Sequence, residues 1–437
     1  MVKVTFMGAG STVFAKNVLG DCMSSPLLKG MEIALYDIDG QRLKDSEMML
    51  QAINRNFGNH ASIKSYLGVE NRKEALRGAD FVVNAIQVGG YDPCTITDFE
   101  IPKKYGLKQT IADTLGIGGI FRSLRTIPVV LDFAREMEEV CPKALFINYT
   151  NPMAMVTGAI QRATSIKALG LCHSVQVCAM TLMNGVGMGD QYDETVQWKI
   201  AGINHQAWLL EITKNGKDLY PEIKERSLKN GPPEWDRVRH EIMHRFGYYI
   251  TESSEHLSEY LPYFIKNQYP ELIERYNIPI DEYMRRCENQ IKGWESLRET
   301  LVSKDTLEHN RSGEYASYII EAIISNKPYK FGGNVLNTGL ITNLPKEACV
   351  EVPCIVDASG IQPIYIGDLP PQLAALNRTN INVQLLTIEA ALTLKKEHIY
   401  HAAMLDPHTS SELTIDNIVA MCDDLIEAHK GWLPEYR

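Results

Sequence analysis

The alternation of short apolar runs with helical segments over residues 1–185 constrains the fold more than any other feature of the sequence. Strands that alternate with helices in this way form a parallel sheet with helices on both faces. We therefore predict a Rossmann-type, doubly wound α/β domain over residues 1–195. Its six expected strands lie at residues 2–7, 32–36, 63–66, 80–86, 145–147 and 168–171.

The pattern changes after residue 195. A strand at 196–201 is followed by a mostly helical stretch at 220–330. Because 437 residues exceed one small domain, we expect a second, larger α+β domain over 196–437, like the C-terminal half of lactate and malate dehydrogenases. Its other expected elements are strands at 334–341 and 349–354 and helices at 373–398 and 415–428.

A glycine-rich turn, Gly8-Ala-Gly-Ser-Thr12, joins the first strand to a helix. Backbone N–H groups and a helix N-terminus in this arrangement can hold a pyrophosphate. Val13 replaces the third glycine of the usual dinucleotide-binding pattern, so the motif alone is weak. Asp37 ends the second strand, where a carboxylate binds ribose hydroxyls and disfavours a 2′-phosphate; a solvated turn residue is the alternative. Together with the glycine turn upstream, Asp37 indicates that this domain binds NAD.

Polar residues also lie at the ends of the fourth and fifth expected strands: Asn84 and Gln87 at the fourth, and Asn148 at the fifth. Glycine turns after strands, as in Gln87-Val-Gly-Gly90, let a cofactor approach the backbone closely. Ligands of open α/β sheets bind at the carboxyl ends of the strands. The residues that we expect to contact NAD are Gly8, Gly10, Ser11, Thr12, Asp37, Asn84, Gln87 and Asn148.

The sixth strand ends on Cys172 and His173. A thiol and an imidazole at that edge are candidates for chemistry, and a buried cysteine with a helix-capping histidine is the alternative. His205 is a second candidate metal ligand, although its long spacing from Cys172 carries no motif information.

Other polar residues allow two roles each. Residues 251–260 gather acids with one His and one Tyr, a composition that also fits a solvated helix face. Arg122 and Arg125 could hold a polar ligand or pair with surface carboxylates. The sequence Asn151-Pro152 at a strand end predicts a turn, and such a turn can aim an amide at a sugar hydroxyl.

Composition disfavours several classes of protein. The chain has a formal net charge of −10 without a Lys/Arg block, so we expect no nucleic-acid partner. No apolar run approaches the ~20 residues that span a bilayer, and no signal peptide precedes the first strand, which predicts a cytoplasmic protein. Nine Cys without paired spacing predict reduced thiols.

Several short motifs are spread over nearly the whole chain: Gly8-Ala-Gly-Ser11, Asp113-Thr-Leu-Gly-Ile-Gly-Gly119, Asn148-Tyr-Thr-Asn-Pro152, Cys172-His173, Gly202-Ile-Asn-His205, Asn334 through Pro345 and Asp406-Pro407. Taken together, these motifs resemble the NAD- and metal-dependent glycosidases of glycoside hydrolase family four. The form Cys-His-Ser-Val is most similar to the α-galactosidase branch; α-galacturonidases carry Glu-Val after Cys-His, and α-glucosidases of the family are a further alternative.

The resemblance implies hydrolysis through transient oxidation, an exception to the two-carboxylate scheme of most glycosidases. NAD⁺ would oxidise the sugar C3 hydroxyl, a base would remove the C2 proton, and the C1 leaving group would depart by elimination. Water would then add, and NADH would return the hydride. Mn²⁺ would hold the C2 and C3 oxygens as a Lewis acid.

The resemblance also implies roles for individual residues. Cys172 and His205 would be the metal ligands, and His173 would protonate the leaving oxygen. Tyr260 would be the base at C2, with Glu252 or Glu255 as alternatives. The residues implied to contact the substrate are Asn151, Asn204 and Arg122, and a homodimer or homotetramer is expected.

Two other classes of function fit parts of the sequence. A 2-hydroxy-acid dehydrogenase would use the same folds, but it needs a His with a partner Asp and no metal-binding thiolate. A catalytically inactive NAD-binding sensor would not need Cys172, His173 and His205 together.

Overall fold

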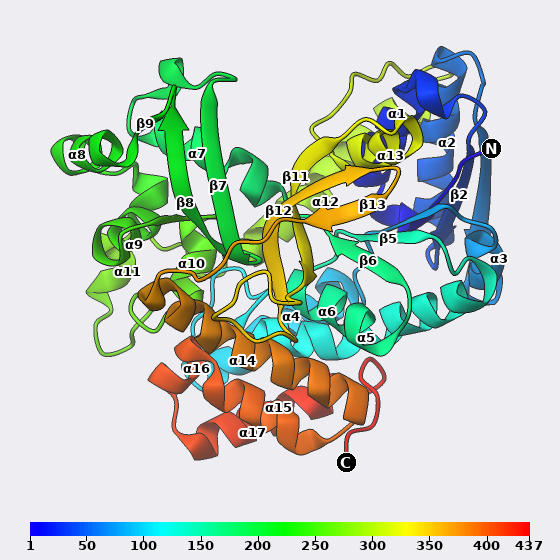
Figure 1. Cartoon of the computed structure of the whole chain (residues 1–437). Coiled ribbons are helices and arrows are strands. Elements are labelled where there is room, and N and C mark those ends of the chain that lie inside the picture. The colour runs from blue at the N-terminus through cyan, green and yellow to red at the C-terminus, as the bar shows by residue number, and fades with distance from the viewer.

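One mixed sheet runs through the computed structural model, which describes residues 1–437 (Figure 1). The strand order is β10-β8-β7-β12-β11-β6-β5-β4-β1-β2-β3, with β13 paired to β12 and β9 to β8. Its N-terminal part is parallel and matches the six predicted strands within a few residues: β1 Lys3–Met7, β2 Glu32–Asp37, β3 Ser62–Leu67, β4 Phe81–Asn84, β5 Leu145–Asn148 and β6 Lys167–Gly170.

Helices connect these strands and cover the sheet. In the order β6-β5-β4-β1-β2-β3, the topological switch point lies between β1 and β4. A ligand crevice is therefore expected beyond the carboxyl ends of these two strands. The connecting helices are α1 Val13–Ser24, α2 Gly40–Asn56, α3 Arg72–Leu76, α4 Ile96–Lys104, α5 Gly116–Val140, α6 Met153–Ala163 and α7 His173–Gly185.

The later strands extend the same sheet in antiparallel fashion. Strand β11 pairs with β6 through Asn334 and Gly170, and β12 pairs with β7 through Glu351 and Gly202. The strands of this part are β7 Val196–Ile203, β8 Gln206–Lys214, β9 Lys217–Asp218, β10 Tyr249–Ile250, β11 Tyr329–Leu336, β12 Cys349–Asp357 and β13 Gly360–Pro363.

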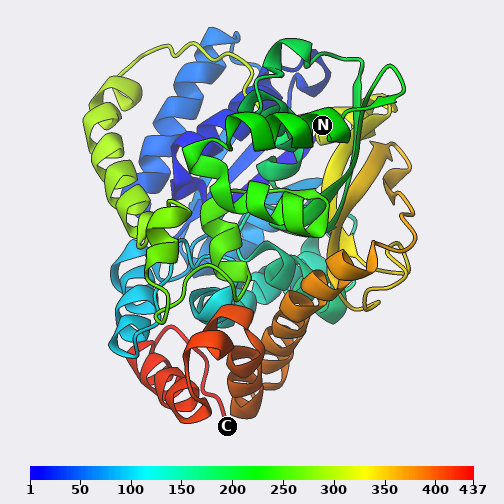
Figure 2. The same cartoon turned by 90° about the vertical axis from the view of Figure 1, so that its left-hand side faces the viewer.

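Ten helices complete the C-terminal half. Figure 1 shows α14 to α17 grouped at one end of the molecule, together with the C-terminus. Figure 2 shows α12 beside α2, where Arg298 binds Asp45 at 2.6 Å. The helices are α8 Tyr220–Asn230, α9 Arg237–Phe246, α10 Ser254–Tyr260, α11 Glu271–Arg275, α12 Glu282–Val302, α13 Ala316–Ser325, α14 Pro371–Thr393, α15 Lys396–Leu405, α16 Pro407–Glu412 and α17 Ile415–Ala428.

Three elements differ from the sequence prediction. The strand predicted at 334–341 lies earlier, as β11, because the Asn337 side chain binds the backbone of Ile341 and the chain turns there. Strand β8 was not expected, because its hairpin turn is Asn204-His205 and lacks the Asn-Gly or Asp-Gly signature. The helix predicted at 373–398 is two helices, since Leu394 adopts a left-handed conformation with φ 58° and ends α14. Helix α17 lies where it was predicted.

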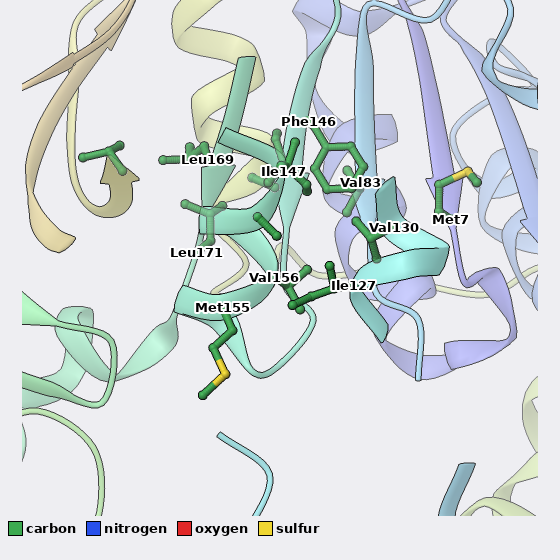
Figure 3. Close-up of a cluster of buried hydrophobic side chains, with 14 of the residues drawn as sticks. Met7, Val83, Ile127, Val130, Phe146, Ile147, Met155, Val156, Leu169 and Leu171 are labelled. Carbon is green, nitrogen blue, oxygen red and sulfur yellow. The ribbon is translucent and has the colours of Figure 1, made fainter. Parts of the chain in front are cut away.

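The main hydrophobic core draws on both halves of the chain, from Val4 in β1 to Leu425 in α17. The predicted boundary at residue 195 falls between α7 and β7, and it stays a prediction because the sheet and core continue across it. None of the helices combines the length and apolarity that a membrane crossing requires. Figure 3 shows part of this core, to which β4 and β5 contribute Val83, Phe146 and Ile147, and α5 and α6 contribute Ile127, Val130, Met155 and Val156.

Candidate active site

Three strand ends bring a thiol, an imidazole and a carboxylate together. Cys172 follows β6, His205 lies in the two-residue turn between β7 and β8, and Glu252 follows β10, which pairs with β8. Their ligand atoms all lie within 4.8 Å of one another. His205 and Glu252 both have φ 63°, a conformation that costs about 1–3 kcal/mol for such residues and that gathers at functional sites.

The donor set fits a divalent cation. Glu252 and a Cys172 thiolate would neutralise two positive charges, and His205 would add a neutral nitrogen. Without a cation, burial and the charges of Glu351 and Glu252 raise the pKa of Cys172 well above its usual range, so the thiol keeps its proton. Ser174 lies 3.1 Å from the sulfur, where its hydroxyl can donate to a thiolate.

Both ring nitrogens of His205 have partners. Nε2 lies 3.3 Å from a carboxylate oxygen of Glu252, and Nδ1 lies 3.0 Å from the hydroxyl of Tyr260. Tyr260 is fully buried, and burial together with nearby carboxylates raises its pKa well above the usual value. Tyr260 therefore lies directly behind the candidate metal ligand.

His256 and Asp113 also belong to this site, and neither was singled out from the sequence as a site residue. His256 lies 3.5 Å from Glu252 and 3.6 Å from Asp113. Burial lowers the pKa of His256, but these two carboxylates outweigh it and raise the pKa to about 9. Asp113 opens a motif and His256 lies among the acids at 251–260, yet only the folded chain brings them together.

Two predicted substrate residues lie beside Asp113. Asn151 donates its amide to Asp113 at 3.1 Å, and Arg122 donates to the backbone carbonyl of Asn151 at 3.3 Å. Arg122 also donates to Tyr283 at 3.1 Å and is buried, so it does not form the surface ion pair that was its alternative role. Asn204 is fully buried, and neither polar atom of its amide has a protein partner.

The remaining chemistry candidates lie further out. His173 opens α7 with a ring that is 54% exposed, and its Nε2 lies 2.7 Å from Glu314. That hydrogen bond raises the pKa of His173. Glu255 points to Arg286 at 3.0 Å and does not belong to the three-donor cluster.

The glycine turn is closely packed against its neighbours. A Cβ on Gly8, whose φ is +87°, would lie 2.7 Å from the carbonyl of Ala85, and one on Gly10 would lie 2.7 Å from Asp37. The Gly10 amide donates to Asp37 at 2.6 Å. The Ser11 hydroxyl is buried without a protein partner. The two glycines allow this close packing because they have no side chain, and the buried Ser11 hydroxyl is left free to bind a phosphate ligand.

Of the other residues predicted to contact NAD, three form side-chain hydrogen bonds within the protein. Asn84 and Asn148 are fully buried, and the amide of Asn84 donates to Asn148 at 2.9 Å. Gln87 is exposed and donates to Thr95 at 3.3 Å. Thr12 is buried with φ 49° and precedes α1. Contacts of these four residues with a cofactor stay predictions.

The comparisons with known proteins establish the family. The descriptions "Family 4 glycosyl hydrolase" and "Family 4 glycosyl hydrolase C-terminal domain" match residues 3–188 and 200–409. The chain belongs to the family 4 glycosyl hydrolases. The resemblance found in the sequence is thereby confirmed, and with it the fold class of a Rossmann-like domain followed by a C-terminal domain.

Relatives cover the whole chain. An α-galactosidase of Bacillus subtilis (strain 168) is 60% identical over 100% of both chains, and one of Rhizobium meliloti (strain 1021) is 33% identical over 99% of this chain and 89% of its own. Among solved structures, a putative glucosidase, lplD, of Bacillus subtilis has a TM-score of 0.87 at 25% identity, covering 97% and 99%. A 6-phospho-α-glucosidase from gut microorganisms, in complex with NAD and Mn²⁺, has a TM-score of 0.79 at 20% identity over 100% of both chains.

Proposed function

We propose that this protein is an α-galactosidase that cleaves its substrate by transient oxidation at C3, deprotonation at C2, elimination and water addition. The cluster of Cys172, His205 and Glu252 at the strand ends carries the proposal, because ordinary two-carboxylate hydrolysis needs no metal-binding thiol. The two α-galactosidase relatives support the choice of sugar. Membership of a glycosyl hydrolase family speaks against a 2-hydroxy-acid dehydrogenase.

Two cofactors belong to the proposal. NAD⁺ would be held by the turn Gly8–Thr12 and Asp37, and Mn²⁺ by the three-donor cluster. When bound, they would supply a hydride acceptor and a Lewis acid. The 6-phospho-α-glucosidase of similar fold, solved with both, supports this pair. Glu252 thus takes the role of a ligand rather than that of the alternative base.

Tyr260 is the proposed base at C2. If Nε2 of His205 binds a cation, the proton of the neutral ring must lie on Nδ1, which then donates to the Tyr260 oxygen. A donated hydrogen bond favours the phenolate, and this offsets part of the burial that opposes it.

The remaining roles concern the substrate. His173 would protonate the leaving oxygen, and Asn151, Asn204 and Arg122 would contact the sugar. The contact between Arg122 and Asn151 and the unpartnered amide of Asn204 support this grouping. The homodimer or homotetramer and the cytoplasmic location rest on the family resemblance and on the sequence, and they stay predictions.

A panel of p-nitrophenyl glycosides tests the function. The protein is incubated with the α-galactoside, α-glucoside and α-galacturonide, each with and without NAD⁺, Mn²⁺ and a reductant. We expect nitrophenol from the α-galactoside, dependent on both cofactors and without net NADH. Cleavage of only the other sugars would move the protein to another branch. Absence of any glycoside cleavage, with net NADH formed in a parallel incubation with a 2-hydroxy acid and NAD⁺, would overturn the proposal.

A further inference from the structure

Residues 312–316, which we call the brace, lead into the first residue of α13 and contact the strand end that carries Cys172 and His173. The hydroxyl of Tyr315 donates to the backbone carbonyl of Cys172 at 2.6 Å, and the Ala316 amide donates to the hydroxyl of Tyr149 at 3.1 Å. Tyr315 is only 2% exposed. The C-terminal end of the brace is therefore fixed to the site from within the protein.

The other end of the brace is fixed to α1 through Asp21, a fully buried carboxylate. Ser312 donates its amide to Asp21 at 2.8 Å and its hydroxyl at 2.6 Å, and His309 binds the same carboxylate at 2.7 Å. Gly20 makes room for this contact, since a Cβ there would lie 2.6 Å from the His309 ring. Three donors on one buried carboxylate form a stable anchor.

Glu314 lies between these two anchors. Its amide donates to the hydroxyl of Ser312 at 3.2 Å, so a chain of hydrogen bonds runs from Glu314 through Ser312 to Asp21. Its carboxylate is 12% exposed and lies 2.7 Å from Nε2 of His173, whose ring is 54% exposed. A fixed acceptor thus meets an exposed imidazole, which would otherwise sample several rotamers.

Two aromatic rings complete the surroundings of His173. Tyr149 and Tyr315 have ring centroids 6.0 and 6.2 Å from that of His173. Tyr315 belongs to the brace and binds the Cys172 carbonyl through its hydroxyl, and the Tyr149 hydroxyl accepts from the Ala316 amide of the brace. The groups that fix Glu314 therefore also flank the ring that Glu314 binds.

We infer that Glu314 is a positioning residue for the proton donor, held in place by the brace and by Asp21. This inference rests on the role of His173 in the proposed function. With Nε2 bound to Glu314, the other ring nitrogen is left to give its proton to the leaving oxygen. That oxygen takes the electron pair of the breaking C1–O bond together with the proton, and the N–H that faces Glu314 is retained.

The test separates leaving-group departure from the earlier proton removal at C2. Wild type and Glu314→Gln are incubated in D₂O with methyl α-galactoside, which has a poor leaving group, in the presence of NAD⁺ and Mn²⁺. Deuterium that enters C2 of the recovered substrate is compared with hydrolysis. We expect the ratio of exchange to hydrolysis to rise ~10-fold or more in the variant, a part of the ~10²–10⁴-fold that a general acid supplies.

Controls and contrary outcomes are defined by the same ratio, which does not depend on the amount of folded protein. Glu321→Gln changes a carboxylate that binds Arg311 instead of His173, and it should leave the ratio unchanged. His173→Ala should raise the ratio, and adding Glu314→Gln to it should have no further effect.

The inference would be overturned if exchange and hydrolysis fell together in Glu314→Gln, or if the two changes had independent effects on the ratio in the double variant. No exchange at C2 in any protein, wild type included, would instead count against the proposed function.

Discussion

At the scale of single residues, the site combines groups that the sequence identifies with groups that only folding brings in. Cys172 and His205 were identified because strand ends bind ligands and because the chain resembles a family. Glu252 is proposed as a ligand and not as the alternative base, because the turn after β10 puts its carboxylate 3.3 Å from His205. His256 could not be found in this way, since its contacts with Glu252 and Asp113 depend on how α10 packs against the segment before α5.

Cys172→Ser tests the metal site. Serine keeps the shape of the side chain but does not ionise to a soft anion, so metal affinity and kcat/KM should both fall by more than the ~10–100-fold typical of an outer-shell partner. NAD binding, followed by tryptophan fluorescence, should be retained because the glycine turn is untouched. A variant with wild-type activity and Mn²⁺ affinity would refute the role of Cys172.

Tyr260→Phe distinguishes a base from an orienting group. Loss of the base should stop deuterium exchange at C2 even at saturating Mn²⁺. Loss of an orienting contact to His205 should weaken Mn²⁺ binding and be rescued by excess metal. We expect the first result. Full recovery of exchange with excess Mn²⁺ would assign Tyr260 to positioning alone.

At the scale of elements, strong periodicity predicted the structure well and turn chemistry predicted it poorly. The parallel strands are continuous apolar runs, so their positions were clear from the sequence. Strand β8 was missed because the turn before it is built from Asn204 and from His205, which has a positive φ although it is not a glycine. Arg125 is buried in α5 and binds Asp98 of α4 at 2.5 Å, not a surface carboxylate.

Asp98→Asn tests the contact that joins α4, α5 and the C-terminal segment. Arg125 and His429 both bind Asp98, at 2.5 and 2.8 Å, with all three side chains buried. Loss of the carboxylate charge leaves Arg125 uncompensated and should lower the free energy of unfolding by ~3–5 kcal/mol in urea denaturation. Asp132→Asn, whose partner Arg135 is exposed, should change it by no more than ~1 kcal/mol. Equal effects of the two changes would contradict this view of the buried contact.

At the scale of the whole molecule, one sheet connects the glycine turn to the three-donor cluster. The glycine turn lies at the end of β1, and Cys172 lies after β6, at the same edge of the parallel strands. The antiparallel extension then brings His205 and Glu252 to that edge. A dinucleotide fold in a glycosyl hydrolase is explained if a redox step precedes bond cleavage.

Removal of the metal tests whether this arrangement exists before the metal binds. The hydrophobic core does not depend on the three-donor cluster, so EDTA should abolish glycoside cleavage while the circular dichroism spectrum persists. Added Mn²⁺ should restore activity. Cleavage that survives complete chelation, verified by metal analysis, would contradict a metal-dependent reaction.

The fate of the C2 hydrogen tests the central claim most directly. p-Nitrophenyl α-galactoside carrying deuterium at C2 is cleaved in H₂O with NAD⁺ and Mn²⁺, and the galactose formed is analysed by NMR. The account predicts that the label is lost to water and that cleavage of the labelled substrate is no faster than that of the unlabelled one. A product that keeps all of its label at C2, with no isotope effect, would show ordinary hydrolysis and contradict the account.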